Sequence, residues 1–591
     1  MKKWVIKAIK ADFDEIARKH NISPILARLL VNRGMVEDSD IDKFLNGTKE
    51  DMYSPFLLKD MDVACETILK SIQEGKRIRI VGDYDIDGVC ATAILVRGLR
   101  CIGAEVSTRL PHRINDGYGL NKNIIEEAKN DGIELIITCD NGIAAFDEIK
   151  LAVEYGIEVV VTDHHEVPFE IIDDEKVYKL PPAKAVVDPH REDDDTPYKN
   201  ICGAMVAYKL IKALDQLITD RIITNGLNNI SSSVEEMIFE FAGFATVGDI
   251  MPLCDENRIA VKYALSSMKT TKNIGMSSLM DVQGVKRERL SPYHIGFVLG
   301  PCINATGRLS TADIALELLL TENSERALEI AKQMRELNEE RKRIEDEKLK
   351  EAYELVDTMS DGHDYASDTV LLIYIKDCHE SLAGLIAGKL REKYSKPSIV
   401  FTDAKDGWKG SGRSIDAYNM HDEFMKYNDM LVKFGGHPMA CGLTIDPNKF
   451  EEFRRLINES SPLTEEDLVE KYSIDIDMPI NYSDMALVNE LEKLAPFGQG
   501  NPSPLFAQKN LSIVSRKGNA KGNYLTLQVR TLPHGDRPEK TMFATKFCDS
   551  NNALLELEGV QTITMAYVPE YNDFFDRVQL SIKDIKDIEL K

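Results

Sequence analysis

Three short apolar runs in the first third of the chain share one design. RIRIVGD (77–83), IELIITCD (133–140) and IEVVVTD (157–163) are rich in β-branched residues, and each ends in aspartate. Helical patterns lie between them, for example CATAILVRGLRCI and NIIEEAKNDG. Strands that alternate with helices predict a parallel α/β sheet. Because ligands bind beyond the carboxyl ends of such strands, we expect these three aspartates, Asp83, Asp140 and Asp163, to converge on one edge.

The pattern changes twice further along the chain. From 324 to 359, apolar residues recur at helical spacing within a highly charged surface, which predicts one helix about 54 Å long. We interpret it as a spacer that joins two lobes, and a coiled-coil arm is the alternative. After about residue 497, the segments YLTLQVR, TITMAYV and RVQLSIKDI alternate with period two. This alternation predicts a small antiparallel β-barrel or sandwich.

Composition narrows the class of protein. The chain has 591 residues, which predicts about three to four domains. Ten scattered cysteines without a CxxC pair predict reduced thiols in a cytoplasmic protein. We expect no membrane association, because no stretch reaches the ~20 apolar residues of a membrane span and the N-terminus has no signal-peptide run. The net charge of −25 argues against nonspecific coating of nucleic acid but allows a local basic track.

The segment VGDYDIDG places Asp83, Asp85 and Asp87 at intervals of two, just after the first strand. The pattern D-x-D-x-D-G also opens an EF-hand calcium loop. In that loop position twelve would be Ile94, where a glutamate is required, so we reject this interpretation. A solvated acidic turn is the remaining alternative, and the polar residues at the other two strand ends disfavour it.

Carboxylates that face one another cannot all stay ionised without a cation. Oxygen ligands with one or two imidazoles suit Mn²⁺ or Mg²⁺ better than Zn²⁺. The number of carboxylates suggests two ions about 3.5–4 Å apart, with Asp140 on the middle strand as the natural bridge. In TDHHEVP, the adjacent His164 and His165 should point to opposite sides, so one can be a ligand while the other faces the substrate.

Together, these motifs resemble a known group of enzymes. VGDYDIDG, TCDNG, TDHHEVP and FATVGDIMPL resemble motifs I to IV of the DHH phosphoesterase superfamily. PHRINDGYGL, GPCINATGRL, CHESLAGLIAGKL, GSGRS, KFGGHPMACG and LAPFGQGNPSP are similar to the bacterial RecJ family of single-strand-specific 5′→3′ exonucleases. The resemblance runs in the same order from about residue 50 to 510.

The resemblance implies an α/β fold with a parallel-sheet DHH domain, a long linking helix, a second α/β domain called DHHA1 and a C-terminal OB-fold β-barrel. The implied boundaries are an N-terminal helical segment at 1–50, the DHH domain at 51–320, the helix at 321–359, DHHA1 at 360–460 and the OB domain at 461–591.

The resemblance also implies roles for matching residues. The metal ligands for two Mn²⁺ or Mg²⁺ ions would be Asp83, Asp85, Asp87, Asp140, His164 and Asp249. Asp163 would orient a ligand and His165 would touch the scissile phosphate, so both would act in catalysis with Asp140 and His164. The substrate-binding residues would be Arg113, Asn304, Arg308, Ser411, Arg413 and His437, and the arginines with Ser411 would recognise the 5′ end. Arginine forks and glycine-exposed amides suit phosphate.

Two local features need separate interpretation. Asp188 stands in VVDPH where the family has asparagine, and it is either an additional carboxylate near the metals or a loop cap, which we favour. Over 497–550 the chain carries eight basic and three acidic residues, although its overall charge is negative. A basic groove on an OB barrel would follow a single strand. Tyr524 is either a stacking platform there or an ordinary core residue.

The sequence is compatible with three functions. The first is a single-strand DNA exonuclease of DNA repair and recombination, for which the resemblance implies single-stranded DNA as ligand, and a single-strand-binding protein and a helicase as candidate partners. The second is a phosphodiesterase for oligoribonucleotides or cyclic dinucleotides, or a pyrophosphatase. A tiny substrate would not need the long helix and the β domain. The third is an inactive binding relative, which the intact acidic motifs disfavour.

Overall fold

The computed structural model describes residues 3–113, 116–172, 175–221, 227–358 and 363–590. The chain forms two compact units. The larger unit consists of Tyr53–Met251 and Ala260–Glu470, and the smaller one of Met1–Met52, Pro252–Ile259 and Lys471–Lys591. The smaller unit is thus assembled from both ends of the chain and one short internal segment.

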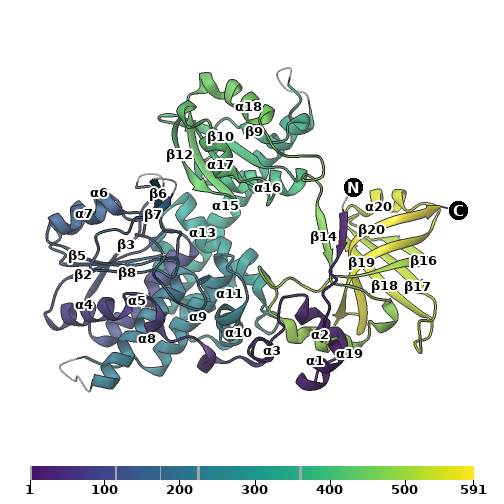
Figure 1. The fold of residues 1–591 in the computed structure, drawn as a ribbon, viewed down its shortest axis with the longest axis horizontal. Coiled ribbons are helices and arrows are strands. Elements are labelled where there is room, and N and C mark those ends of the chain that lie inside the picture. The colour runs from purple at the N-terminus through teal and green to yellow at the C-terminus, as the bar shows by residue number, and fades with distance from the viewer. Residues whose placement is uncertain (1–2, 114–115, 173–174, 222–226, 359–362, 591) are drawn as a thin grey trace. The chain divides into compact units, whose positions relative to one another are not determined.

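A five-stranded, fully parallel sheet forms the first part of the larger unit (Figure 1). Its strands, in spatial order, are β3 (Val106–Arg109), β2 (Ile78–Val81), β4 (Leu135–Cys139), β5 (Glu158–Thr162) and β8 (Ala185–Val187). The surrounding helices are α4 (Met61–Gln73), α5 (Ile86–Ile102), α6 (Lys122–Asn130), α7 (Phe146–Glu154), α8 (Gly203–Arg221) and α9 (Ser232–Gly248). Helices α6 and α7 share a core cluster with one face of the sheet, while α5 and α8 contact the other. Burial on both faces explains why the strands are continuous β-branched runs, and the predicted parallel α/β sheet is confirmed.

The long helix is α15 (Ser324–Asp357), which has 34 residues and is therefore about 51 Å long. Asn323 caps its start by accepting the backbone N–H groups of Glu325 and Arg326. The helices that precede it are α10 (Asp255–Ser267), α11 (Ile274–Val282), α12 (Pro292–His294), α13 (Gly300–Leu309) and α14 (Asp313–Leu320). Helix α15 packs against α11, α13 and α14, and also against α16 (Glu380–Tyr394) of the following lobe. These contacts fit the spacer interpretation rather than a free coiled-coil arm.

The second lobe of the larger unit is built on a mixed five-stranded sheet. Its strands, in spatial order, are β12 (Leu431–His437), β13 (Ala440–Ile445), β11 (Gly407–Arg413), β10 (Ser398–Ala404) and β9 (Leu371–Tyr374). Helices α17 (Met420–Met425) and α18 (Phe450–Glu459) complete a core with this sheet that includes Phe401, Phe424 and Phe453. This second α/β domain was expected from the sequence. A separate two-stranded hairpin in the first lobe pairs β6 (Phe169–Ile172) with β7 (Glu175–Tyr178).

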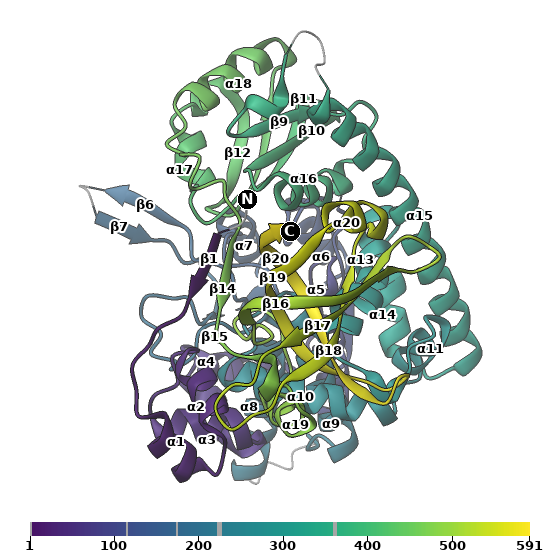
Figure 2. The same cartoon turned by 90° about the vertical axis from the view of Figure 1, so that its right-hand side faces the viewer.

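The smaller unit contains a closed β-barrel, whose strands Figure 2 shows together. The barrel strands are β16 (Phe506–Gly518), β17 (Tyr524–Thr531), β18 (Lys540–Phe547), β19 (Val560–Asn572) and β20 (Arg577–Leu590). Around the barrel lie β1 (Lys3–Ile6), β14 (Lys471–Ile474), β15 (Ile476–Asp477), α19 (Met485–Leu491) and α20 (Ser550–Glu556). Pairing of β16 with both β17 and β19 closes the barrel. The predicted barrel is confirmed, with one parallel pair, β18 with β20, among antiparallel ones.

The N-terminal helices belong to the same core as this barrel. They are α1 (Phe13–His20), α2 (Pro24–Val31) and α3 (Asp38–Asn46), and Leu26, Leu30 and Phe44 share a hydrophobic cluster with the barrel strands. The buried guanidinium of Arg258 donates to the backbone carbonyls of Phe44 and Leu494. The first fifty residues therefore fold onto the C-terminal domain.

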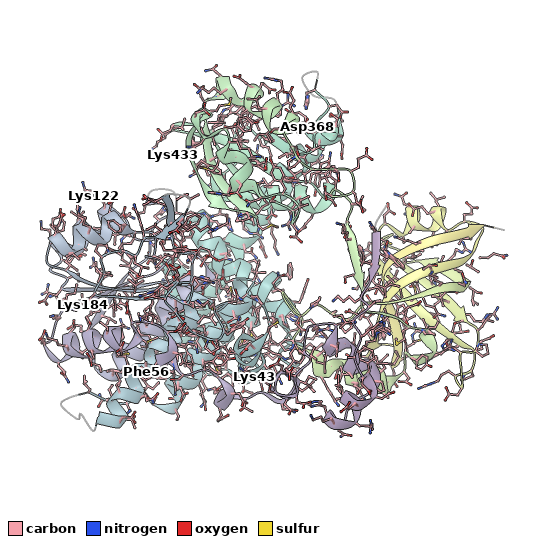
Figure 3. All side chains as sticks on the ribbon, viewed as in Figure 1. Lys43, Phe56, Lys122, Lys184, Asp368 and Lys433 are labelled. Atoms are coloured by element: carbon pink, nitrogen blue, oxygen red, sulfur yellow. The ribbon has the colours of Figure 1, made fainter. Side chains whose placement is uncertain are left out.

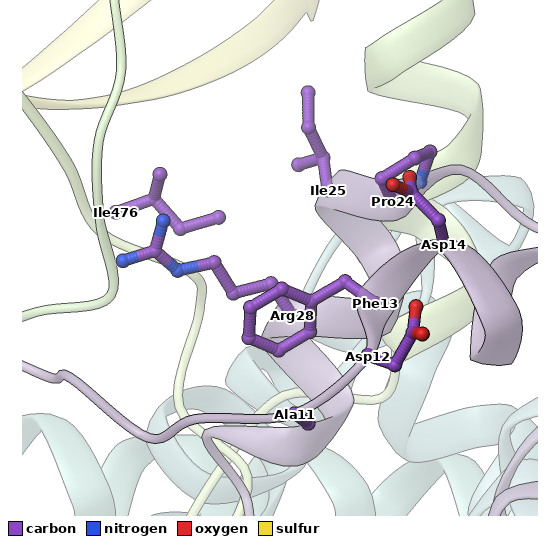
Figure 4. A pocket seen from close by; sticks show the side chains of 8 residues that line it. All are labelled: Ala11, Asp12, Phe13, Asp14, Pro24, Ile25, Arg28 and Ile476. Carbon is purple, nitrogen blue, oxygen red and sulfur yellow. The ribbon is translucent and has the colours of Figure 1, made fainter.

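Figure 3 draws the side chains on the ribbon and labels Lys122 and Lys433, both of which are largely exposed. Figure 4 shows a hollow of the smaller unit lined by residues of α1 and α2 with Ile476. Asp12 in this hollow is already used as the cap of α1, because it accepts the backbone N–H of Glu15. No helix in the described part of the chain combines the length and apolar character needed to cross a membrane.

Candidate active site

Aspartates follow three neighbouring strands of the parallel sheet. Asp83 comes two residues after β2, Asp140 directly after β4, and Asp163 directly after β5. Because β2 pairs with β4 and β4 with β5 in parallel, the carboxyl ends of these strands lie at one edge. All three side chains are buried. The structure therefore brings together the three aspartates that the strand pattern predicted to converge.

The first turn of α5 supplies two more carboxylates. Asp85 is the N-cap of α5 and accepts the backbone N–H groups of Asp87 and Gly88 at 3.0 and 3.1 Å. Asp87 is fully buried and accepts the N–H groups of Gly203 and Ala204 at 2.6 and 2.9 Å. The N-terminus of α8 thus fixes Asp87 through its free backbone donors.

The backbone around Asp140 is strained and tightly packed. Asp140 has a φ of 61°, a left-handed conformation that costs free energy and is often found at functional sites. Gly203 lies against it, and a Cβ added at Gly203 would be 2.6 Å from the Asp140 Cβ. Only glycine therefore leaves room for Asp140 here. Sequence reasoning missed Gly203, although a glycine at the start of the helical pattern ICGAMVAYKL was a visible signal.

The ligand atoms of these residues form three overlapping groups, each within 4.8 Å: Asp83, Asp85 and Asp140; Asp87, His164 and Asp249; and Asp140, His164 and His165. The His164 Nε2 atom is 3.0 Å from Asp140 Oδ1, 3.5 Å from Asp87 Oδ2 and 3.8 Å from Asp249 Oδ2. Asp140 and His164 each belong to two groups, so they stand where two metal positions would meet. All six residues expected as metal ligands lie in this cluster.

The electrostatics of the cluster are those of a site that needs a cation. Burial, together with the neighbouring carboxylates Asp87 and Asp85, raises the pKa of Asp140 well above its usual range. Burial and the Asp85 charge do the same to Asp83, and burial and the Asp87 charge to Asp249. Burial lowers the pKa of His164, which keeps the imidazole neutral and able to act as a ligand. Buried oxygen donors with one imidazole fit Mn²⁺ or Mg²⁺.

Asp163 and His165 form a separate pair beside the cluster. Asp163 Oδ1 is 2.7 Å from His165 Nδ1, and Asp163 also accepts the backbone N–H groups of Ile143 and His164. Burial alone would lower the pKa of His165, but the hydrogen bond and charge of Asp163 raise it to about 9. The Tyr118 hydroxyl donates to the Asp140 carbonyl and lies 3.1 Å from His165 Nε2. Tyr118 stands in PHRINDGYGL, but sequence reasoning did not single it out.

Asp188 follows β8, at the same edge of the sheet, and is fully buried. Its Oδ1 accepts the backbone N–H of His190 at 2.7 Å, which is the contact of a loop cap. Burial and the nearby Asp163 raise its pKa to about 8. This hydrogen bond agrees with the interpretation of Asp188 as a loop cap.

The predicted arginines come from three different elements of the larger unit. The Arg113 guanidinium stacks over the Tyr84 ring at 4.7 Å. Arg308, near the end of α13, donates to the Ser381 carbonyl, and Arg413, at the end of β11, donates to the Gly412 carbonyl at 2.7 Å. Burial, with the charges of Arg113, Arg341 and Arg413, lowers the pKa of Arg308 to about 9. The guanidinium groups are therefore close enough to repel one another.

Strand register places the remaining predicted residues of the second lobe. Ser411 and Arg413 are two residues apart on β11, so their side chains share a face of the sheet. Ala440 pairs with both Arg413 and His437, which puts His437 in the same row. His437 is exposed. Asn304 has a different contact, because its Oδ1 accepts the backbone N–H of Ile86 at 2.8 Å and so holds the start of α5.

Comparison with known proteins first defines the class. Models described as the DHH family N-terminal domain, the DHHA1 domain and the RecJ OB domain match residues 77–241, 367–460 and 474–584. The chain is thus a DHH-type protein with a DHHA1 lobe and an OB barrel.

Individual relatives then define the family. The chain is 31% identical over 582 residues to the single-stranded-DNA-specific exonuclease RecJ of Salmonella typhimurium, and the match covers 96% of each chain. It is 32% identical over 534 residues to the protein of that name from Bacillus subtilis, a match that covers 89% of this chain and 64% of the relative. The crystal structure of Thermus thermophilus RecJ in complex with Mn²⁺ has a TM-score of 0.80 at 25% identity, with 99% of this chain and 80% of that one covered. The chain belongs to the RecJ family, as its motifs indicated.

Proposed function

We propose that this chain is a metal-dependent exonuclease that degrades single-stranded DNA from its 5′ end. The observation that carries the proposal is the overlap of the ligand groups at Asp140 and His164. This overlap occurs on the fold of a family whose curated members are named single-stranded-DNA-specific exonucleases.

Two Mn²⁺ or Mg²⁺ ions are the proposed cofactors. Asp83, Asp85 and Asp140 would hold one ion, and Asp87, His164 and Asp249 the other, with Asp140 between them. When bound, such a pair lowers the pKa of water and stabilises charge on an attacked phosphate. The related Thermus structure contains Mn²⁺, in agreement with the donor set.

The side chains around the ions have separate proposed tasks. Asp163 holds His165 through Nδ1, and Nε2, which lies 3.1 Å from the Tyr118 hydroxyl, is the proposed contact to the scissile phosphate. The Tyr118 ring meets the imidazole edge-on and limits its rotation. The backbone N–H groups of Gly203 and Ala204 keep Asp87 oriented toward the ions. His165 would therefore approach the phosphate in a fixed orientation.

The arginines would recognise the terminal phosphate. In the described part of the chain, Arg113, Arg308 and Arg413 have no carboxylate within ion-pair distance, and their guanidinium groups contact carbonyls and an aromatic ring instead. Guanidinium groups that repel one another gain most from a doubly charged anion. Ser411 adds a hydroxyl on the same face as Arg413. A terminal 5′ phosphate fits this chemistry.

One experiment separates the proposal from its alternatives. A long single-stranded DNA with a 5′ phosphate, the matching duplex, a cyclic dinucleotide and a short oligoribonucleotide are incubated with the chain, with and without Mn²⁺. We expect mononucleotides from the long single strand only, and only with metal. Preferential cleavage of the small ribonucleotides would favour the small-substrate enzyme, and inactivity on all four with retained strand binding would favour an inactive relative.

The partners and the location follow from the same proposal. The exposed Lys517, Lys521 and Arg530 of the barrel are proposed to bind the backbone of long single strands. Tyr524 is partly exposed and could stack on a base, although its hydroxyl also contacts Thr545.

A single-strand-binding protein and a helicase are the proposed protein partners. The cytoplasm is the proposed location, in which the ten free thiols would stay reduced.

A further inference from the structure

One helical run connects several parts of the candidate site. It begins with α12 at Pro292, passes through a π-helical segment, Ile295–Leu299, and continues as α13 to Leu309. Helix α13 packs on α15 and α5 (Figure 1). Short π-helical segments within α-helices are often found at functional sites.

The accessible side of this run is a single stripe. From Leu299 to Gly307, every residue is buried except Pro301 and Asn304, and Arg308 comes one turn after Asn304. Tyr293 and Phe297 continue the stripe toward the start of the run at intervals of four residues. The stacking of the Tyr293 and Phe297 rings places these two residues on one face of the run. The stripe therefore leads from Arg308 through Asn304 to two aromatic side chains.

The two aromatic rings are unusually exposed. Tyr293 is 62% and Phe297 66% exposed, and their rings stack with centroids 5.3 Å apart at an interplanar angle of 25°. Large exposed apolar groups in a cluster indicate a binding surface. No contact of the described residues buries this pair.

The segment after α9 approaches the same helical run. Cβ atoms added at Gly248 and Gly300 would lie 2.4 and 3.1 Å from the Ile86 Cδ1 atom, so the end of α9 and the start of α13 meet at Ile86. Ile250, two residues after Gly248, is 72% exposed and has a φ of 59°. A β-branched residue in that conformation is strained, and strain of this kind is retained where function requires it.

We propose that Tyr293 and Phe297 form a stacking platform for nucleobases on the 3′ side of the scissile bond, with Ile250 at its border. The inference rests on the proposed function. If the 5′ phosphate binds at Arg308 and the scissile phosphate lies near Asn304 and the acidic cluster, the rest of the strand continues along the stripe toward Phe297. At ~1.5 Å per residue, Phe297 and Tyr293 lie about 10 and 16 Å beyond Asn304. At ~3.4 Å per stacked nucleotide, these distances correspond to about three to five nucleotides.

Aromatic rings suit this task because every base has a π-face, so stacking tolerates any sequence. A nuclease that shortens an arbitrary strand needs such tolerance. The platform would also keep the next nucleotides in line, so that each cleavage is followed by a short advance. It would act on binding of the strand and not on the chemistry at the metals.

The test is an abasic scan of binding by the full chain without divalent metal. Each oligonucleotide carries a 5′ phosphate, a 3′ fluorophore and one abasic nucleotide, placed at successive positions from the 5′ end. We expect the wild type to bind about tenfold more weakly when the abasic nucleotide lies about three to five positions beyond the scissile bond. The variant Tyr293→Ala/Phe297→Ala should bind the intact strand about tenfold more weakly and lose this dependence on position.

Two further variants make the test specific. Phe297→Leu keeps an apolar side chain without an aromatic face, and it should also lose the position dependence. Phe146→Ala removes an exposed phenylalanine of α7 and should reproduce the wild-type profile. Thermal unfolding of each variant establishes that it is folded.

The outcomes distinguish the platform from the proposed function. A flat wild-type profile, or a position dependence that survives in both aromatic variants, would overturn the platform. Cleavage of a 5′-phosphorylated dinucleotide by the wild type with Mn²⁺ tests the proposed function alone, because a dinucleotide ends before the platform. Failure of that cleavage, together with failure on long strands, would remove the proposed function itself.

Discussion

The acidic cluster and the group of arginines are built in opposite ways. The acidic residues lie at the ends of adjacent parallel strands and at helix ends, and backbone N–H groups hold several of them in place. Gly203 and Ala204 donate to Asp87, and Ile143 donates to Asp163. The arginines come from α13, β11 and the loop after β3, more than a hundred residues apart, and carbonyls or a ring hold them.

This difference teaches what each group needs. Like charges repel within each group, and neither group is neutralised by the other in the described residues. The pKa of Asp140 is raised and that of Arg308 is lowered because each group is buried beside like charges and has no counter-ion among the described residues. A pair of divalent cations would satisfy the first group and a terminal phosphate the second. Substitutions in the acidic cluster should therefore reduce metal binding and cleavage, and substitutions of the arginines should reduce binding of the 5′ phosphate.

The largest effect is expected from Asp140→Ala. Activity on single-stranded DNA should fall by at least about a thousandfold, because the metals supply several kcal/mol of charge stabilisation. The fold should persist with an equal or higher melting temperature without metal, since one buried carboxylate is removed from a repelling cluster. Asp147→Ala, an exposed carboxylate of α7, is the matched control and should behave as the wild type. Nuclease activity near the wild-type level in Asp140→Ala would contradict the metal assignment.

Gly203→Ala should have the next largest effect. Its added methyl would meet the Cβ and Cα of Asp140 at 2.6 and 2.8 Å, so the carboxylate must move. We expect activity to fall about a hundredfold, as when other groups that orient metal ligands are disturbed, and Mn²⁺ affinity to fall with it. Gly388→Ala on α16 has no atom within 4 Å of the new methyl and is the control. Unchanged Mn²⁺ affinity in Gly203→Ala would show that Asp140 is not held by this contact.

Arg413→Ala should affect only the terminal phosphate. Loss of a charged hydrogen bond costs ~1.5–3 kcal/mol, or roughly 10- to 150-fold in affinity, and only for strands with a 5′ phosphate. Binding constants for 5′-phosphate and 5′-hydroxyl strands measure this difference. Arg455→Ala, an exposed arginine of α18 in the same lobe, should leave both constants unchanged. Equal losses on both strands would place the end-binding pocket elsewhere.

The smallest effect is expected in the barrel. Lys517→Gln/Lys521→Gln should weaken binding of long strands and reduce the salt dependence by about 0.7 for each phosphate that is no longer neutralised. Cleavage of short strands should stay the same, because chemistry occurs in the other unit. Lys10→Gln, an exposed lysine of the same unit, is the control. An unchanged salt dependence on long strands would exclude these lysines from the track. Point variants are preferable to truncation, since the N-terminal helices share the core of the barrel.

The two groups also differ in what the sequence revealed. Strand ends could be located because β2, β4 and β5 are buried on both faces and read as continuous β-branched runs, and the parallel arrangement then placed Asp83, Asp140 and Asp163 together. The arginines have no local pattern, and only the resemblance of whole motifs indicated them. Gly203 was missed because it matters only by leaving room for Asp140, and the sequence does not show that these two distant residues are in contact. The N-terminal helices and the barrel share one core, although they are more than four hundred residues apart in sequence. Local periodicity cannot predict such a contact.

The most direct test of the central claim is to count the metal ions in the acidic cluster. The chain is titrated with Mn²⁺ while binding is followed by calorimetry, and the saturated protein is examined by electron paramagnetic resonance. Because Asp140 belongs to one ligand group with Asp83 and Asp85 and to another with His164, we predict two ions per chain and the spectrum of a magnetically coupled pair. Asp140→Ala should lose the coupling. A single uncoupled ion, or a coupled pair that persists without Asp140, would contradict the account.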